Sequence, residues 1–148
     1  MDTIIVIVIL VLYHFLAINV LEKIAVRELF GANDITRRPL PECKSSDTFL
    51  CMGMPSGHVE VTTIAVLSLM RVGILTPEIS AIIIGLMGIQ RVVSHMHTIT
   101  QVIIGGILGI AYFCLYNECE FSWKSLLIPI IISITLCIII CTIDDATI

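Results

Sequence analysis

The chain has 148 residues and a formal net charge of −4, and 57% of its residues are apolar while only 14% are charged. Soluble domains have about 25% charged residues, and a soluble fold of this size has too little interior to hide so much aliphatic surface. The composition therefore excludes an ordinary soluble domain and predicts a membrane protein. The few basic residues form no run with interleaved aromatics, which excludes a nucleic-acid binder.

The first predicted element is a membrane helix from about Thr3 to Leu21. Nearly all of its residues are Ile, Val or Leu, and the run is long enough to span a bilayer. Met1 is followed by Asp2 rather than by a basic region, and no small-x-small cleavage site follows the run. We therefore interpret it as a retained helix and not as a signal peptide.

A polar loop from Phe30 to Met54 comes next and is the only long loop. The later apolar segments are too long and continuous for the alternation of an outer-membrane barrel. The sequence therefore predicts an all-α fold, a polytopic transmembrane bundle of about five helices in a single domain, residues 1–148. The four later segments are, in chain order, Pro55–Leu75, Ile79–Ser94, Thr98–Tyr116 and Leu126–Ile143.

The long loop gathers most of the cations on one face of this predicted bundle. By the positive-inside rule that face would be cytoplasmic.

The six cysteines include no CxxC pair and no Cys/His cluster with zinc spacing. Cys43 and Cys51 flank the loop and could pair if it faces an oxidising compartment. In the predicted segment Thr98–Tyr116, the small residues Gly105, Gly106 and Gly109 let membrane helices approach closely.

Three short stretches on the cationic face contain groups suited to binding an anion. Arg91 ends an otherwise apolar helix, and its guanidinium cannot be neutralised, so it needs an anion or an aqueous niche. His97 and Gln101 are four residues apart on one helix face, so the Gln101 carbonyl can fix the imidazole tautomer and leave the other nitrogen as a nucleophile or base. The three stretches are Arg37-Arg38-Pro39, Pro55-Ser56-Gly57-His58, and Arg91 with His97 and Gln101.

Each stretch also has a plainer explanation when it is taken alone. An Arg-Arg pair beside a membrane helix can set topology, and Ser56 with Gly57 can begin a helix. Neither explanation accounts for His58 at the membrane end of a helix, where an ionisable group is costly. Together the stretches predict a phosphate site, in which Arg38 and Arg91 supply forked donors and a helix start supplies backbone N–H groups.

The carboxylates of the long loop are scattered at Asp34, Glu42 and Asp47 and do not form a magnesium ligand pattern. We therefore expect no metal and no other cofactor. The arginines would neutralise the charge that metal ions neutralise in kinases. His95 has the wrong spacing for the role of either other histidine, and we interpret it as a neighbouring polar residue.

In these motifs the chain resembles the type 2 phosphatidic acid phosphatase superfamily, which has Lys-x6-Arg-Pro, Pro-Ser-Gly-His and Ser-Arg-x5-His-x3-Asp in this order. The corresponding stretches here are Arg38-Pro39, Pro55-Ser56-Gly57-His58 and Gln90-Arg91-x5-His97-x3-Gln101. The resemblance spans about Lys23 to Gly109. It implies hydrolysis of a phosphate ester or diphosphate on a lipid through a phosphohistidine.

The resemblance also implies a role for each matching residue. His97 would be the nucleophile, and His58 would protonate the leaving oxygen and then activate water. The phosphoryl group would be held by Arg38, Arg91, Ser56 and the backbone of Gly57.

The family lysine has no counterpart at the expected place, because Gly31 stands seven residues before Arg38. Arg27 or Lys23 could serve as this phosphate ligand only if the intervening segment is rearranged. Two glutamines are further departures: Gln90 replaces the family Ser, and Gln101 replaces the family Asp. Gln101 can orient His97 but cannot supply a charge; a Gln at this place, followed by Gly105-Gly106, looks like the dolichyl-diphosphatase branch.

Three functions stay open on the sequence. The first is a metal-independent lipid phosphatase or diphosphatase acting on a lipid of the prenyl diphosphate or phosphatidic acid type. The second is a catalytically impaired lipid-phosphate binding protein or a lipid head-group phosphotransferase. The third, a structural or pore-forming protein, gives no reason for the ionisable groups to converge.

The expected partners are a lipid phosphate substrate and membrane lipids. A second copy of the chain could complete the bundle, because five helices are fewer than the six usual in the family. The sequence predicts a multi-pass integral membrane protein and does not indicate which membrane holds it.

Overall fold

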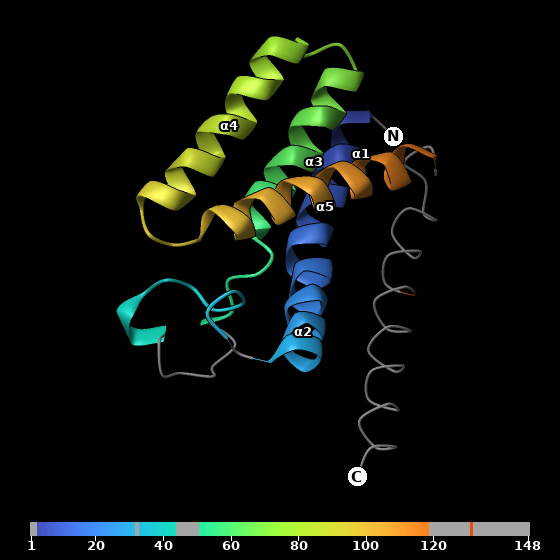
Figure 1. Ribbon diagram of the computed structural model, residues 1–148. Coiled ribbons are helices and arrows are strands. Elements are labelled where there is room, and N and C mark those ends of the chain that lie inside the picture. The colour runs from blue at the N-terminus through green and yellow to red at the C-terminus, as the bar shows by residue number, and fades with distance from the viewer. Residues whose placement is uncertain (1–2, 32, 44–50, 119–130, 132–148) are drawn as a thin grey trace.

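The computed structural model describes residues 3–31, 33–43, 51–118 and 131 (Figure 1). Every regular element in these residues is a helix, which confirms the all-α prediction. Apart from Ile131, the predicted fifth segment at Leu126–Ile143 lies outside the described residues. The elements are α1 (Thr3–Tyr13), η1 (His14–Ile18), α2 (Asn19–Phe30), η2 (Pro41–Cys43), α3 (Gly57–Arg71), α4 (Pro77–Val93) and α5 (Ile99–Glu118).

The first three elements form one continuous helix of 28 residues, Thr3–Phe30, which continues well past the predicted end at Leu21. The charged residues after Leu21 reduce the hydropathy, but Glu, Lys and Arg are good helix formers and do not stop the helix. Gly31 ends it with a φ of 66°, a conformation that glycine adopts without steric cost. Within this helix, η1 is a π-helical turn, a feature often found at functional sites.

Two helices in the described part of the chain are long and apolar enough to cross a membrane, Thr3–Phe30 and Ile99–Asn117. Helices α4 and α5 each expose a row of aliphatic side chains to their surroundings, and lipid tails are the surroundings that such rows fit. The row on α4 is Ile82, Leu86, Ile89 and Val93, and the row on α5 is Ile99, Ile103, Ile107 and Ile110; each of these is more than half exposed.

Helix α3 is the central element, since it packs against α5, α4 and the N-terminal helix (Figure 1). Two glycines on one face of α5 allow the close approach of α3. A Cβ added to Gly105 would lie 2.6 Å from the carbonyl oxygen of Ser56, and one added to Gly109 would lie 2.7 Å from that of Glu60. A Cβ on Gly106 would only touch Val59 at 4.0 Å.

A buried polar network joins the N-terminal helix to α3 and α5. The π-helical turn directs His14 inward, where it is 0% exposed. Its Nδ1 lies 2.7 Å from the Tyr116 hydroxyl and its Nε2 lies 2.5 Å from the Glu60 carboxylate, while Asn19 donates to the other Glu60 oxygen at 3.3 Å. Polar groups in an apolar bundle need such partners, so these contacts fix which faces of the three helices meet.

Replacing Gly109 by Ala should destabilise the protein, because the new methyl group would collide with the backbone of α3. Overpacking of this kind costs about 1–3 kcal/mol. Gly106→Ala is the matched control: its methyl group meets only an ordinary contact, and Ala favours the helix. Thermal unfolding in detergent should show a lower midpoint for Gly109→Ala and an unchanged or higher one for Gly106→Ala. Equal midpoints would contradict the close packing of α3 and α5.

Candidate functional site

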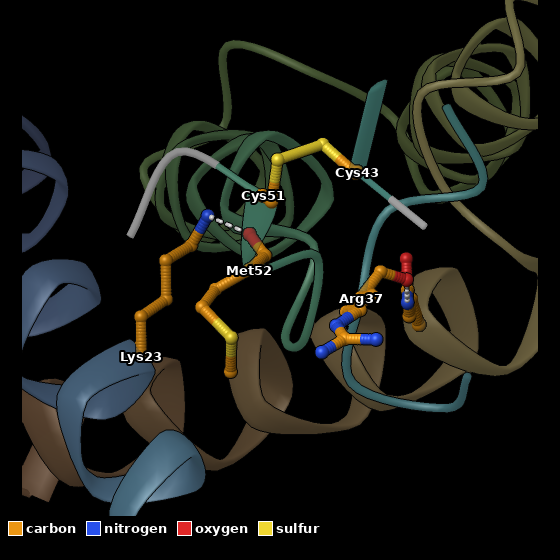
Figure 2. Close-up of a disulfide and its surroundings, with 6 residues drawn as sticks. Lys23, Arg37, Cys43, Cys51 and Met52 are labelled. Carbon is orange, nitrogen blue, oxygen red and sulfur yellow. Dashed lines mark hydrogen bonds between the residues drawn. A yellow bond between two sulfur atoms is a disulfide. The ribbon is translucent and has the colours of Figure 1, made fainter. Parts of the chain in front are cut away.

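Two parts of the long loop meet in a short antiparallel contact between Arg37 and Met52, and a disulfide closes the segment between them. The Arg38 N–H donates to the Cys51 carbonyl at 2.8 Å and the Gly53 N–H donates to the Thr36 carbonyl at 2.7 Å. Cys43 and Cys51 are bonded, with sulfur atoms 2.10 Å apart (Figure 2). This confirms the pairing that the sequence left open, and it places the Arg38 backbone against the residues that lead into α3.

Gln101 attaches this loop to α5. Its side-chain N–H groups donate to the carbonyls of Ile35 and Arg37 at 2.8 and 2.7 Å. These two acceptors determine which end of the amide is nitrogen, so the amide oxygen must face the other way. That oxygen accepts from the Thr98 backbone N–H at 3.2 Å and lies 3.2 Å from Nδ1 of His97.

His97 is 3% exposed, and its tautomer is fixed by its neighbours. Nδ1 lies 2.9 Å from the Gly53 carbonyl as well as 3.2 Å from the Gln101 oxygen. Both neighbours are acceptors, so Nδ1 must bear the proton and the lone pair is on Nε2. Burial, and next the charge of Arg38, lower the pKa of His97 to about 4. The ring is therefore neutral near pH 7, as a nucleophile must be.

Arg38 acts electrostatically on this imidazole, and Arg91 and His58 belong to the neighbouring helix ends. The Arg91 carbonyl accepts the His97 N–H at 3.2 Å, so the end of α4 and the start of α5 are tied together. Burial, and next the charge of Arg91, lower the pKa of Arg38. His58 is exposed on the first turn of α3, and the charges of Arg91, Arg38 and Lys23 all act on it.

Ser56 precedes α3, and the plainer interpretation expected its side chain to cap this helix. The side chain makes no such capping hydrogen bond. It is 0% exposed, and its hydroxyl oxygen has no hydrogen-bond partner among the described residues. The Nε of Arg38 is likewise buried and unpaired in the described part of the chain. A buried polar atom without a partner is costly, so both atoms fit a site that receives an anion.

Lys23 is the cation that sequence reasoning could not place. It is 7% exposed, and its ammonium group donates to the Met52 carbonyl at 3.2 Å, beside the disulfide (Figure 2). Its positive charge acts on both His97 and His58 and disfavours their protonation. Arg27, one turn further along α2, is exposed. The helix continues beyond Leu21, and this is what brings Lys23 rather than Arg27 to the loop.

One group of described residues could hold a metal ion, and it lies in the helical bundle and not in the loop. The ligand atoms of His14, Glu22 and Glu60 lie within 4.8 Å of one another. His14 and Glu60 already bond to each other and to Tyr116 and Asn19. We therefore interpret the group as part of the buried network that joins the helices.

Replacing Gln101 by Glu should destabilise the site although the shape is kept. At neutral pH the carboxylate would present oxygens to the carbonyls of Ile35 and Arg37, and the lost donors should cost about 1–3 kcal/mol or more. Protonation restores one donor, so the difference from the parent should shrink as the pH falls from 7 to 4.5. Thermal midpoints of variant and parent at both pH values measure this. A variant as stable as the parent at pH 7 would contradict the orientation of the amide.

Comparison with known proteins identifies the family. The model of the PAP2 superfamily matches residues 3–125 of the 148-residue chain. No curated protein and no solved structure gives a significant match. The matched range runs from the start of α1 past the end of α5 and includes all three motif stretches. The chain therefore belongs to the type 2 phosphatidic acid phosphatase (PAP2) superfamily, whose members are helical membrane proteins and phosphatases.

Proposed function

We propose that this protein is a lipid phosphatase that cleaves a phosphate ester or diphosphate through a phosphohistidine on His97. The observation that supports this best is the fixed tautomer of His97. Two acceptors bind its Nδ1 proton, so Nε2 is available as a nucleophile beside two arginines. Membership of a phosphatase family supports the same reaction class.

In the first step Nε2 of His97 attacks phosphorus and the bond to the leaving oxygen breaks. The leaving oxygen takes a proton from His58, which is on the first turn of α3 and open to the surroundings. The Gln101 oxygen and the Gly53 carbonyl accept the hydrogen bond from Nδ1 and stabilise the positive charge that develops on the ring. Neither group is anionic, so they stabilise the imidazolium through dipoles alone.

In the second step water attacks the phosphohistidine. His58, now without its proton, takes a proton from the water, and the bond between phosphorus and Nε2 breaks. Phosphate leaves and the neutral His97 is restored. The same two histidines thus exchange acid and base roles between the steps.

The charge of the phosphoryl group is neutralised by side chains in this proposal. Arg38 and Arg91 provide forked donors, and Ser56 with the Gly57 N–H stands at the start of α3, where a helix favours an anion. We add Lys23 as the cation that takes the place of the family lysine, in preference to Arg27. These groups give the reaction a metal-independent mechanism, in which positioning and electrostatics provide most of the catalysis.

The substrate is a lipid because the site is next to apolar helices in what we propose is a multi-pass membrane protein. The Gln at position 101 favours a polyprenyl diphosphate, by similarity to the dolichyl-diphosphatase branch. The apolar helices also suit the diacyl tails of phosphatidic acid. The alternative, a binding protein or phosphotransferase, rests on Gln101, because an amide cannot supply the charge of the family carboxylate.

Purified protein in detergent with EDTA should release phosphate from at least one prenyl diphosphate, prenyl monophosphate or phosphatidic acid. His97→Ala should lower the rate by a factor of about 10³ or more, since loss of a nucleophile removes the covalent route. His95→Ala is the matched control, because His95 is exposed two residues away, and it should keep the parental rate.

Three other outcomes would contradict this proposal in different ways. Activity that disappears with EDTA and returns with a metal would point to the His14, Glu22 and Glu60 group. Transfer of phosphate to an added alcohol in preference to water would indicate a phosphotransferase. Lipid binding without release from any substrate would indicate a binding protein.

We further propose that the catalytic face opens to an oxidising compartment. The Cys43–Cys51 disulfide lies on this face, and disulfides persist in the extracytoplasmic space or in the lumen of the secretory pathway. The count of cations favours the opposite orientation. However, phosphate binding would by itself explain the presence of Lys23, Arg38 and Arg91 on this face. These cations are therefore weak indicators of membrane topology.

A membrane-impermeant maleimide can test this orientation. Ile35→Cys places a thiol on the loop and Ile74→Cys places one at the opposite end of α3; both positions are more than half exposed. In sealed cells or right-side-out vesicles, the thiol at position 35 should be labelled and that at position 74 should not. Labelling of position 74 alone would overturn the proposed orientation.

A further inference from the structure

An apolar groove runs between α4 and α5 and has α3 as its floor. Its volume is about 510 Å³, which is within the range of about 300–1,000 Å³ typical of ligand pockets. Its walls are aliphatic side chains and glycines from the three helices. The residues that define it best are Val59, Ile84, Gly85, Val92, Ile99 and Gly106.

One end of the groove begins at the catalytic residues. Val59 follows His58 on the first turn of α3, Val92 follows Arg91 at the end of α4, and Ile99 begins α5 two residues after His97. The pairs at the end of α4 and the start of α5 thus place groove residues and candidate catalytic residues at the same end of the bundle. The groove therefore begins beside the candidate phosphate site.

The other end of the groove lies toward the middle of the helices. From Val92 to Ile84 is eight residues, or roughly 12 Å along α4 at 1.5 Å per residue. Ile84 and Gly85 line this deeper part. A Cβ on Gly85 would meet nothing within 4 Å, so the absence of a side chain there widens the groove without serving any helix contact.

We propose that this groove binds the hydrocarbon tail of the lipid whose phosphate occupies the His97 site. The inference rests on the proposed phosphatase function and extends it to substrate specificity. The proposed phosphate ligands Lys23, Arg38 and Arg91 are cationic and the walls of the groove are apolar, which matches an amphiphile with an anionic head and a long apolar tail. A tail that leaves lipid or detergent gains van der Waals contacts in a groove that fits it, so the groove should select by tail length.

Filling the groove at Gly85 tests the proposal without touching the chemistry. Gly85→Phe places a ring in open space, so the protein should fold. For a long-chain prenyl diphosphate, the KM of this variant should rise by about tenfold or more, as expected when the ring displaces tail groups from an apolar pocket that fits them. For p-nitrophenyl phosphate, which has no tail, kcat/KM should stay within about twofold of the parent.

Ile82→Phe is the matched control, because Ile82 is about one turn from Gly85 on the same helix, does not line the groove and is 60% exposed. It places the same ring outside the groove and should leave both substrates unaffected. Graded variants Gly85→Ala and Gly85→Leu should raise the KM of the long lipid in order of side-chain size. A long-lipid KM that is unchanged in Gly85→Phe, while p-nitrophenyl phosphate is still hydrolysed, would overturn the groove proposal and leave the phosphatase intact.

A binding measurement keeps the two proposals separate if no hydrolysis is detected. Native mass spectrometry of His97→Ala, with and without Gly85→Phe, can count bound long-chain prenyl phosphate. Loss of binding only in the double variant supports the groove even if the enzyme is inactive. Equal binding overturns it, as does a change of oligomeric state in Gly85→Phe, which would show that a second copy of the chain occupies the groove.

Discussion

The buried side chain of Gln101 holds together parts of the chain that are more than 60 residues apart. Its two N–H bonds go to the carbonyls of Ile35 and Arg37, and its oxygen faces His97 and the Thr98 backbone. The loop that presents Arg38 is therefore fixed to the same side chain that orients His97, the proposed nucleophile. A carboxylate could orient His97 equally well, but it has no N–H groups for the loop. Compared with a carboxylate, the amide lacks a negative charge beside His97 but makes two additional hydrogen bonds to the loop.

The second requirement is that α3 and α5 approach closely enough for these contacts to form. Gly105 lies against the backbone of Ser56, and the Ser56 N–H donates to the Gln101 carbonyl at 3.2 Å. The residue before α3 is thus held by α5, on the same turn that presents Gln101. In an apolar bundle there is little hydrophobic driving force between helices, so close packing and hydrogen bonds determine the arrangement. The position of the proposed phosphate ligands at the start of α3 follows from this contact.

Hydropathy predicted the described helices well but could not show where they end. The prediction took the second segment to Leu75, whereas α3 ends at Arg71, because Gly73 turns the chain with a φ of 78°. The first helix runs beyond its apolar part for the opposite reason, since charged residues extend it to Phe30. That extension could not be read from spacing, so Lys23 remained ambiguous. The carbonyls that bind Gln101 have no sequence signature at all, because every residue has a carbonyl.

The site also requires that several cations lie near one another beside an apolar bundle. Lys23, Arg38 and Arg91 repel one another, and burial makes this repulsion more costly. Burial, and next the charge of Arg38 with a contribution from Lys23, keep His97 neutral, as the proposed nucleophile must be. In the proposed function a phosphate dianion removes this repulsion when it binds, and in the proposed groove the apolar walls add affinity for a tail. On these two proposals the head and the tail of a lipid phosphate each stabilise one half of the site, and neither a free phosphate nor an uncharged lipid would satisfy both.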